Sequence, residues 1–137
     1  MKHFSIGELT RSNKAAELKI DNTPPPSAVK SMEILIDRLL DPIREKWGSP
    51  ITVTSGYRCK ALNRAVGGAA SSHHLMGMAA DITAGDQRRN ARLYHLIRTA
   101  GIPFTHLIWE KGDDSGPQWI HVSLNPDDLR NETRRIR

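Results

Sequence analysis

The stretch SSHHLMGMAAD, at positions 71–81, contains residue types that can bind a metal ion. A catalytic zinc ion takes three protein ligands and keeps one position open, and the ligands are commonly two neutral imidazoles and one carboxylate. His74 and Asp81 are separated by Gly77, whose missing Cβ lets the backbone turn sharply between them. His121 lies later in the chain, in WIHVSL. The sequence therefore offers His74, Asp81 and His121 as a candidate ligand set.

Spacing alone leaves a second interpretation of these residues open. The chain has six histidines, and two of them together with one aspartate can equally be structural or surface groups. We expect only one of His73 and His74 to bind, because adjacent side chains in an extended segment point in opposite directions.

The hydrophobic pattern predicts a long amphipathic helix that begins after Ser27, a good N-cap, and ends before Gly48. Pro42 should kink or restart this helix, and Asp41 could cap its second part. One apolar face recurs at steps of three and four residues, and it consists of Val29, Met32, Ile36, Leu39, Ile43 and Trp47.

The remaining elements alternate between strands and helices without a βαβ rhythm. A helical turn opened by Ser5 is expected over 4–12, an extended linker over 21–27, and a second helix between Asp86 and Gly101. Strands are predicted over 51–58, 79–84, 104–110 and 118–124, and the last two form a hairpin joined by the polar loop 111–117. This pattern predicts an α+β fold: a small single domain, residues 1–137, with a mostly antiparallel sheet and flanking helices.

Composition narrows the class of protein. In 137 residues, 38% are apolar and 26% are charged, which is typical of a soluble globular domain and excludes a disordered chain. The net charge of +5 favours polyanionic partners, either nucleic acid, an anionic membrane surface or an acidic wall polymer. The basic stretch 130–137 has no interleaved aromatic residues, so we interpret it as a solvated tail. Cys59 is the only cysteine, which excludes an internal disulfide framework.

Three segments, SGYRC, SSHHLMGMAAD and WIHVS, resemble in order and spacing the motifs of the M15 family of zinc D-alanyl-D-alanine carboxypeptidases and related peptidoglycan peptidases. The shared pattern is S-x-H-x-x-G-x-A-x-D followed by H-x-S. The resemblance is strongest to the small members found in phages and prophages, and it covers nearly the whole chain. It implies a hedgehog- and DD-peptidase-like fold, and a Zn²⁺ ion held by His74, Asp81 and His121.

The resemblance also implies roles for other residues. Arg58 matches an arginine that polarises the scissile carbonyl or holds the substrate, and Ser72 matches a serine that hydrogen-bonds the substrate or the loop. Many relatives carry an acid three residues before the last histidine as general base, but this chain has Gln118 there. We expect Glu110, at the end of the preceding strand, to replace that acid. The neighbouring loop acids, Asp113 and Asp114, are weaker candidates because a loop tip positions a carboxylate poorly.

The function implied is hydrolysis of a bacterial cell-wall peptide, at the terminal D-Ala-D-Ala bond or at an L,D bond within the stem. The start of the chain lacks the apolar stretch of a secretory signal, so we expect synthesis in the cytoplasm and access to the wall through lysis or as part of a virion. We expect a monomer with no nucleic-acid or membrane partner. Two alternatives stay open: a non-catalytic, zinc-containing wall-binding module, which Gln118 favours, and a nucleic-acid enzyme or binder, which only the charge and the histidine pair suggest.

Overall fold

The structure, a computed structural model, describes residues 1–136. Its helical segments are α1 (Ile6–Thr10), α2 (Asn13–Glu17), α3 (Pro26–Leu35), the π-helical η1 (Ile36–Leu40), α4 (Asp41–Trp47), α5 (Lys60–Ala65), the 3₁₀ turn η2 (His73–Met76) and α6 (Gln87–Thr99). Its strands are β1 (Thr52–Ser55), β2 (Ala79–Thr83), β3 (His106–Glu110), β4 (Trp119–Ser123) and β5 (Glu132–Ile136). Within the described chain, no helix combines the length and the apolar character that crossing a membrane requires.

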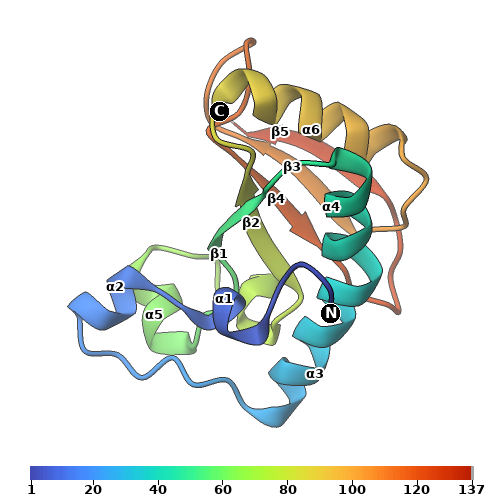
Figure 1. Cartoon of the computed structure of the whole chain (residues 1–137). Coiled ribbons are helices and arrows are strands. Elements are labelled where there is room, and N and C mark those ends of the chain that lie inside the picture. Colours follow the sequence, from blue (N-terminus) through green and yellow to red (C-terminus); the bar gives the residue numbers. More distant parts are fainter. Residues whose placement is uncertain (137) are drawn as a thin grey trace.

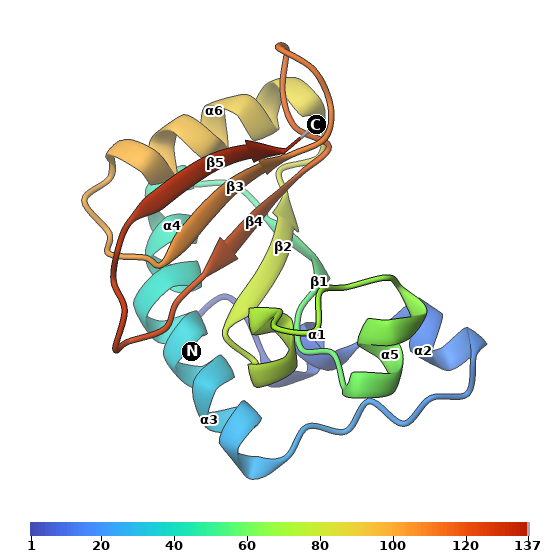
Figure 2. The same cartoon turned by 180° about the vertical axis from the view of Figure 1, so that it is seen from behind.

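The five strands form one sheet in the order β1-β2-β4-β3-β5. The pairs β1–β2, β2–β4 and β3–β4 are antiparallel, and β3–β5 is parallel. Helices α3, α4 and α6 lie on one side of the sheet (Figure 1), and the other side is left open (Figure 2). The predicted α+β fold with a mostly antiparallel sheet is confirmed.

The core lies between the sheet and these helices. Alternate residues of β2, β3 and β4 face it, so one side of each of these strands is apolar while the other side carries the polar groups. The strands contribute Ala80, Ile82, Leu107, Trp109, Ile120 and Val122 to this core, and the helices contribute residues that include Met32, Leu35, Leu39, Ile43, Leu93 and Ile97. The predicted apolar helix face and the hairpin of β3 and β4 are therefore confirmed.

The predicted long helix contains a π-helical segment just before Pro42. Proline has no N–H for the helical ladder, and here the N–H of Asp41 donates to the carbonyl of Ile36, five residues back. The carboxylate of Asp41 is buried and accepts hydrogen bonds from the backbone N–H groups of Lys2 (2.7 Å) and His3 (3.0 Å). The prediction that Asp41 caps α4 was wrong, because this carboxylate instead fixes the N-terminal segment onto the helix.

Other boundaries also differ from the predictions. The first long helix starts at Pro26 rather than after Ser27, because proline is favoured in the first helical turn, where its missing N–H costs nothing. The C-terminal basic stretch is not a solvated tail, since Glu132–Ile136 forms β5 along β3. Its side chains remain largely exposed, but its backbone is paired and Arg135 stacks at 4.0 Å on the Trp109 ring.

Candidate metal centre and catalytic site

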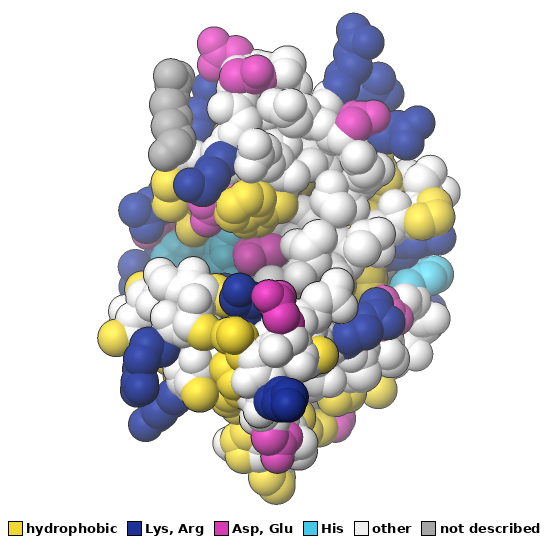
Figure 3. Space-filling model, turned by 90° about the vertical axis from the view of Figure 1, so that its left-hand side faces the viewer, with side chains coloured by type: hydrophobic (Ala, Val, Ile, Leu, Met, Phe, Trp, Pro, Cys, Tyr) yellow, Lys and Arg dark blue, Asp and Glu magenta, His cyan; other side chains and the backbone are white. Residues whose placement is uncertain are grey.

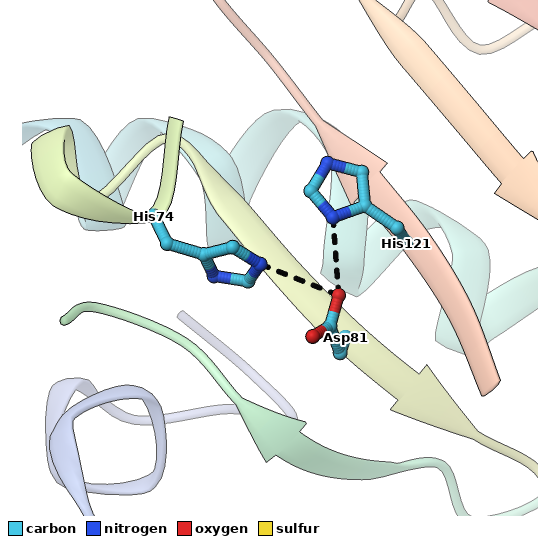
Figure 4. A group of neighbouring side chains, drawn as sticks. All are labelled: His74, Asp81 and His121. Atoms are coloured by element: carbon cyan, nitrogen blue, oxygen red, sulfur yellow. Dashed lines mark hydrogen bonds and ion pairs between the residues drawn. The ribbon is translucent and has the colours of Figure 1, made fainter. Parts of the chain in front are cut away.

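Three separate elements bring His74, Asp81 and His121 together on the open side of the sheet (Figure 4). Asp81 in β2 lies directly opposite His121 in the neighbouring strand β4. The Asp81 Oδ1 atom lies 3.1 Å from His121 Nδ1 and 3.3 Å from His74 Nε2. One ligand atom from each of the three residues lies within 4.8 Å of the other two.

The turn that carries His74 is built around Gly77. This glycine ends η2 with φ of 72°, a left-handed conformation that favours glycine. A Cβ at this position would lie 2.5 Å from the carbonyl oxygen of Ala28 on α3. The predicted sharp turn at Gly77 is confirmed, and it has a second cause in this close approach to α3.

Hydrogen bonds fix the orientation of His74. Its ring Nδ1 lies 2.7 Å from the carbonyl oxygen of Gly56, which can only accept, so Nδ1 carries a proton and donates to it. The other ring nitrogen, Nε2, lies 3.3 Å from Asp81 Oδ1 and is the atom that can bind a metal ion. The backbone N–H of His74 donates to Ser72 Oγ (3.2 Å), and its carbonyl accepts from the N–H of Arg58 (3.1 Å). A metal-binding histidine commonly has its second nitrogen held in this way.

Asp81 is ionised in the cluster. Burial by itself would raise the pKa of its carboxyl group, but hydrogen bonds from His121 and His74 outweigh that cost and hold the pKa well below its ordinary value. An ionised carboxylate and two imidazoles around one point form the donor set of catalytic zinc sites. The donor set therefore fits a zinc ion.

Glu110 lies on the same side of the sheet as the three clustered residues. It pairs across the strands with Trp119, whose side chain points the same way as His121 two residues later. Glu110 and His121 are therefore diagonal neighbours on adjacent strands, and such neighbours are about 7–8 Å apart. Burial, and then the negative charge of Asp81, raise the pKa of the Glu110 carboxyl group above its ordinary value.

Gln118, which is not an acid, and the two loop acids are placed differently. Gln118 is exposed, and its backbone N–H donates to the Glu110 carbonyl (3.0 Å), so the hairpin does bring the two positions together. The Asp113 side chain accepts hydrogen bonds from Ser115 within the exposed loop, and Asp114 pairs with Arg135 at 2.9 Å. Of these four residues, Glu110 alone lies on the strand face that carries the cluster.

Arg58 and Ser72 lie next to His74. The Arg58 Nη2 atom is 3.4 Å from Ser72 Oγ, and its Nε atom is buried without a hydrogen-bond partner among the described residues. Burial lowers the pKa of the Arg58 guanidinium, while the charge of Asp81 acts in the opposite direction. An unsatisfied guanidinium N–H beside the cluster carries a desolvation cost that a hydrogen-bond acceptor would relieve.

A second histidine pair, missed by the sequence analysis, lies beside the cluster. His73 turns away from Asp81 and stacks on His106 of β3, with ring centroids 5.5 Å apart. His106 is joined to Ser123 by a hydrogen bond of 3.3 Å. The alternation His106, Ile108, Glu110 along β3 was the signal that could have placed His106 on this side of the sheet. In Figure 3, histidine and acidic side chains gather in a hollow at mid-height of the molecule, with a basic side chain beneath.

Comparison with known proteins agrees with this geometry. A 38-residue segment is 53% identical to the zinc D-Ala-D-Ala carboxypeptidase of Streptomyces albus G, and it makes up 28% of this chain and 15% of that enzyme. The chain thus matches only a small part of that relative's length. The family model of peptidase M15 matches residues 2–123, which include all three clustered residues. The chain belongs to the peptidase M15 family.

Proposed function

We propose that residues 1–137 form a single zinc peptidase domain that hydrolyses peptide bonds of peptidoglycan. The observation that carries this proposal is the convergence of His74, Asp81 and His121, whose ligand atoms lie within 4.8 Å of one another. Membership of the M15 family and the name of the Streptomyces albus G relative support zinc as the ion and a cell-wall peptide as the substrate.

His74 would hold the ion through Nε2, His121 through Nδ1 and Asp81 through a carboxylate oxygen. When bound, zinc supplies a Lewis acid that lowers the pKa of a coordinated water toward about 7 and polarises a carbonyl group.

Glu110 accepts a proton from the attacking water and delivers it to the leaving amine as the carbon–nitrogen bond breaks. Its raised pKa suits both steps, because a general base and acid works best with a pKa closer to neutral pH. Arg58 donates hydrogen bonds to the oxygen of the scissile carbonyl, where negative charge develops. Ser72 positions Arg58 and the His74 backbone through its hydroxyl group.

The substrate bond is the terminal D-Ala-D-Ala bond or an L,D bond within the stem peptide, and the name of the relative favours the first. We propose that the protein acts on the cell wall as a monomer. Mass spectrometry of muropeptides distinguishes the two bonds, since the first reaction releases only a terminal alanine and the second divides the stem into two peptides.

The test compares the zinc-loaded wild type with Glu110→Gln on purified peptidoglycan. Glutamine keeps the size of the side chain but cannot accept a proton, so the rate of cleavage is expected to fall about 10²- to 10⁴-fold. Asp113→Asn, in the exposed loop, is the matched control and should retain the wild-type rate. Equal rates for wild type and Glu110→Gln would remove Glu110 from the reaction.

A non-catalytic wall-binding module is the second candidate, because Gln118 replaces the acid that the family motif carries. Muropeptides that stay intact after prolonged incubation with a wild-type protein that binds both zinc and wall would establish this alternative.

A further inference from the structure

Strand β1 forms one edge of the sheet, next to the candidate metal centre. Its only strand partner within residues 1–136 is β2, and the register between them shifts between Val53 and Ser55. An edge strand presents backbone N–H and C=O groups that can hydrogen-bond another extended chain. The β1 edge is therefore a candidate site for an extended peptide.

A cavity of about 530 Å³ lies along this edge. Its volume falls within the range of small-molecule sites, about 300–1,000 Å³. The strand and the turn after it form one wall. The other walls are formed by the segment from Arg11 to Lys14, by Leu62 of α5 and by Val66, directly after α5. Figure 3 faces the side of the molecule on which α2 and α5 lie.

The charges around the cavity have one sign. Arg11, Lys14 and Arg58 line it, and no aspartate or glutamate does. Arg11 forms no ion pair within residues 1–136, and Lys14 has only an exposed contact of 3.9 Å with Glu17. Both side chains are exposed and can reach a ligand that carries carboxylates.

The cavity adjoins the candidate metal centre through the residues at the end of β1 and in the turn after it. Ser55, in its wall, lies opposite Asp81, and Gly56, also in the wall, holds the His74 ring through its carbonyl group. Arg58 belongs to both places, since it lines the cavity and contacts Ser72. The cavity and the metal centre are therefore neighbouring sites that share Arg58.

We propose that the cavity along β1 is a subsite for an acidic, extended part of the peptide substrate, which hydrogen-bonds to the β1 edge while Arg11 and Lys14 contact its free carboxylates. This subsite rests on the proposed function, because it takes the substrate to be a cell-wall peptide. Stem peptides have the required chemistry: amide groups along the chain and a free carboxylate on their γ-linked D-glutamate.

Binding to the zinc-loaded full chain tests the subsite without requiring cleavage. The probes are L-Ala-γ-D-Glu-L-Lys-D-Ala and the same peptide with the D-glutamate carboxylate amidated, measured by isothermal titration calorimetry. One exposed ion pair is worth up to about 1 kcal/mol, so amidation should raise Kd for the wild type about fivefold. In Arg11→Glu/Lys14→Glu the two peptides should bind equally or in reversed order.

Lys30→Glu/Lys46→Glu is the matched control, because it makes the same change in net charge at exposed positions of α3 and α4, away from the cavity. This variant should keep the wild-type ratio of the two Kd values. An undiminished ratio in Arg11→Glu/Lys14→Glu, or a wild type that does not distinguish the two peptides, would overturn the subsite. Normal discrimination by a protein that never cleaves peptidoglycan would overturn only the proposed hydrolysis.

Discussion

Zinc is expected to raise the midpoint of thermal unfolding, Tm, because an ion held by His74, Asp81 and His121 binds only the folded chain. At free zinc about a thousand times Kd, mass action adds about 4.1 kcal/mol to the free energy of unfolding. For 137 residues, an unfolding entropy of about 2.1 cal/mol/K per residue gives about 0.29 kcal/mol/K. The expected rise in Tm is therefore about 14 °C.

Differential scanning calorimetry of chelator-treated protein, with and without added zinc, measures this rise. His121→Ala should lose most of it, because the variant keeps only the two ligands that lie close together in sequence. His95→Gln, which changes an exposed histidine on α6 outside the cluster, should keep the full rise. A wild-type Tm that does not respond to zinc, or an equal rise in His121→Ala, would refute the ligand assignment.

Three further predictions concern Arg58, Gly77 and Glu110. Arg58→Ala should lower kcat about 10²- to 10³-fold, as expected for a lost oxyanion donor, while the zinc-dependent rise in Tm persists; a kcat within about twofold of wild type would exclude that role. Gly77→Ala should destabilise the fold more than Gly67→Ala in calorimetry, since both glycines have positive φ but only Gly77 would place a Cβ against a backbone oxygen; equal losses of Tm would show that the contact with α3 relaxes freely. Because the pKa of Glu110 is raised in the folded, metal-free protein, its protonated form contributes stability that is complete below its ordinary value of 4.5 and is lost as pH rises. Without metal, Glu110→Gln should therefore have a larger free energy of unfolding than the wild type, and the difference should grow above about pH 4.5. Urea titrations at several pH values measure this difference. A difference that does not change with pH would contradict the raised pKa of Glu110.

Long elements with one buried face were predictable from the sequence. The long helix could be read from Met32, Ile36, Leu39 and Ile43, all of which are completely buried, since a helix that packs on a sheet must repeat apolar residues every three or four positions. The hairpin of β3 and β4 was predictable for the same reason with a period of two.

Some short or exposed elements were not predictable, although the five-residue helix α1 was, through its cap Ser5. Helices α2 and α5 have only five and six residues, too few to show a period, and their main local signals are the caps Ser12 and Cys59. Strand β5 buries little, so its backbone pairing with β3 and the stacking of Arg135 on Trp109 stabilise it without any hydrophobic alternation.

The candidate site, too, was predictable only in part. His74, Asp81 and His121 could be selected because the motif spacing marks them, and the structure brings them together. The pairing of His73 with His106 depends on the register of the sheet and on the direction of the η2 turn, and neither is visible in a single sequence. The roles of His74, Asp81 and His121 as zinc ligands stay predictions until zinc binding is measured. The catalytic roles of Glu110 and Arg58 stay predictions until activity is measured.

The β5 edge of the sheet has a consequence for association between copies of the chain. On β5, the exposed Arg134 and Arg135 place charged side chains along the outer strand, and charged side chains on an edge strand discourage a second molecule from pairing there. A chain shortened before Glu132 would instead leave the buried strand β3 as the outer strand, with its apolar residues beside an unpaired backbone. We therefore expect strand β5 to hinder association between copies of the chain, in addition to any attraction that its charge exerts on anionic surfaces.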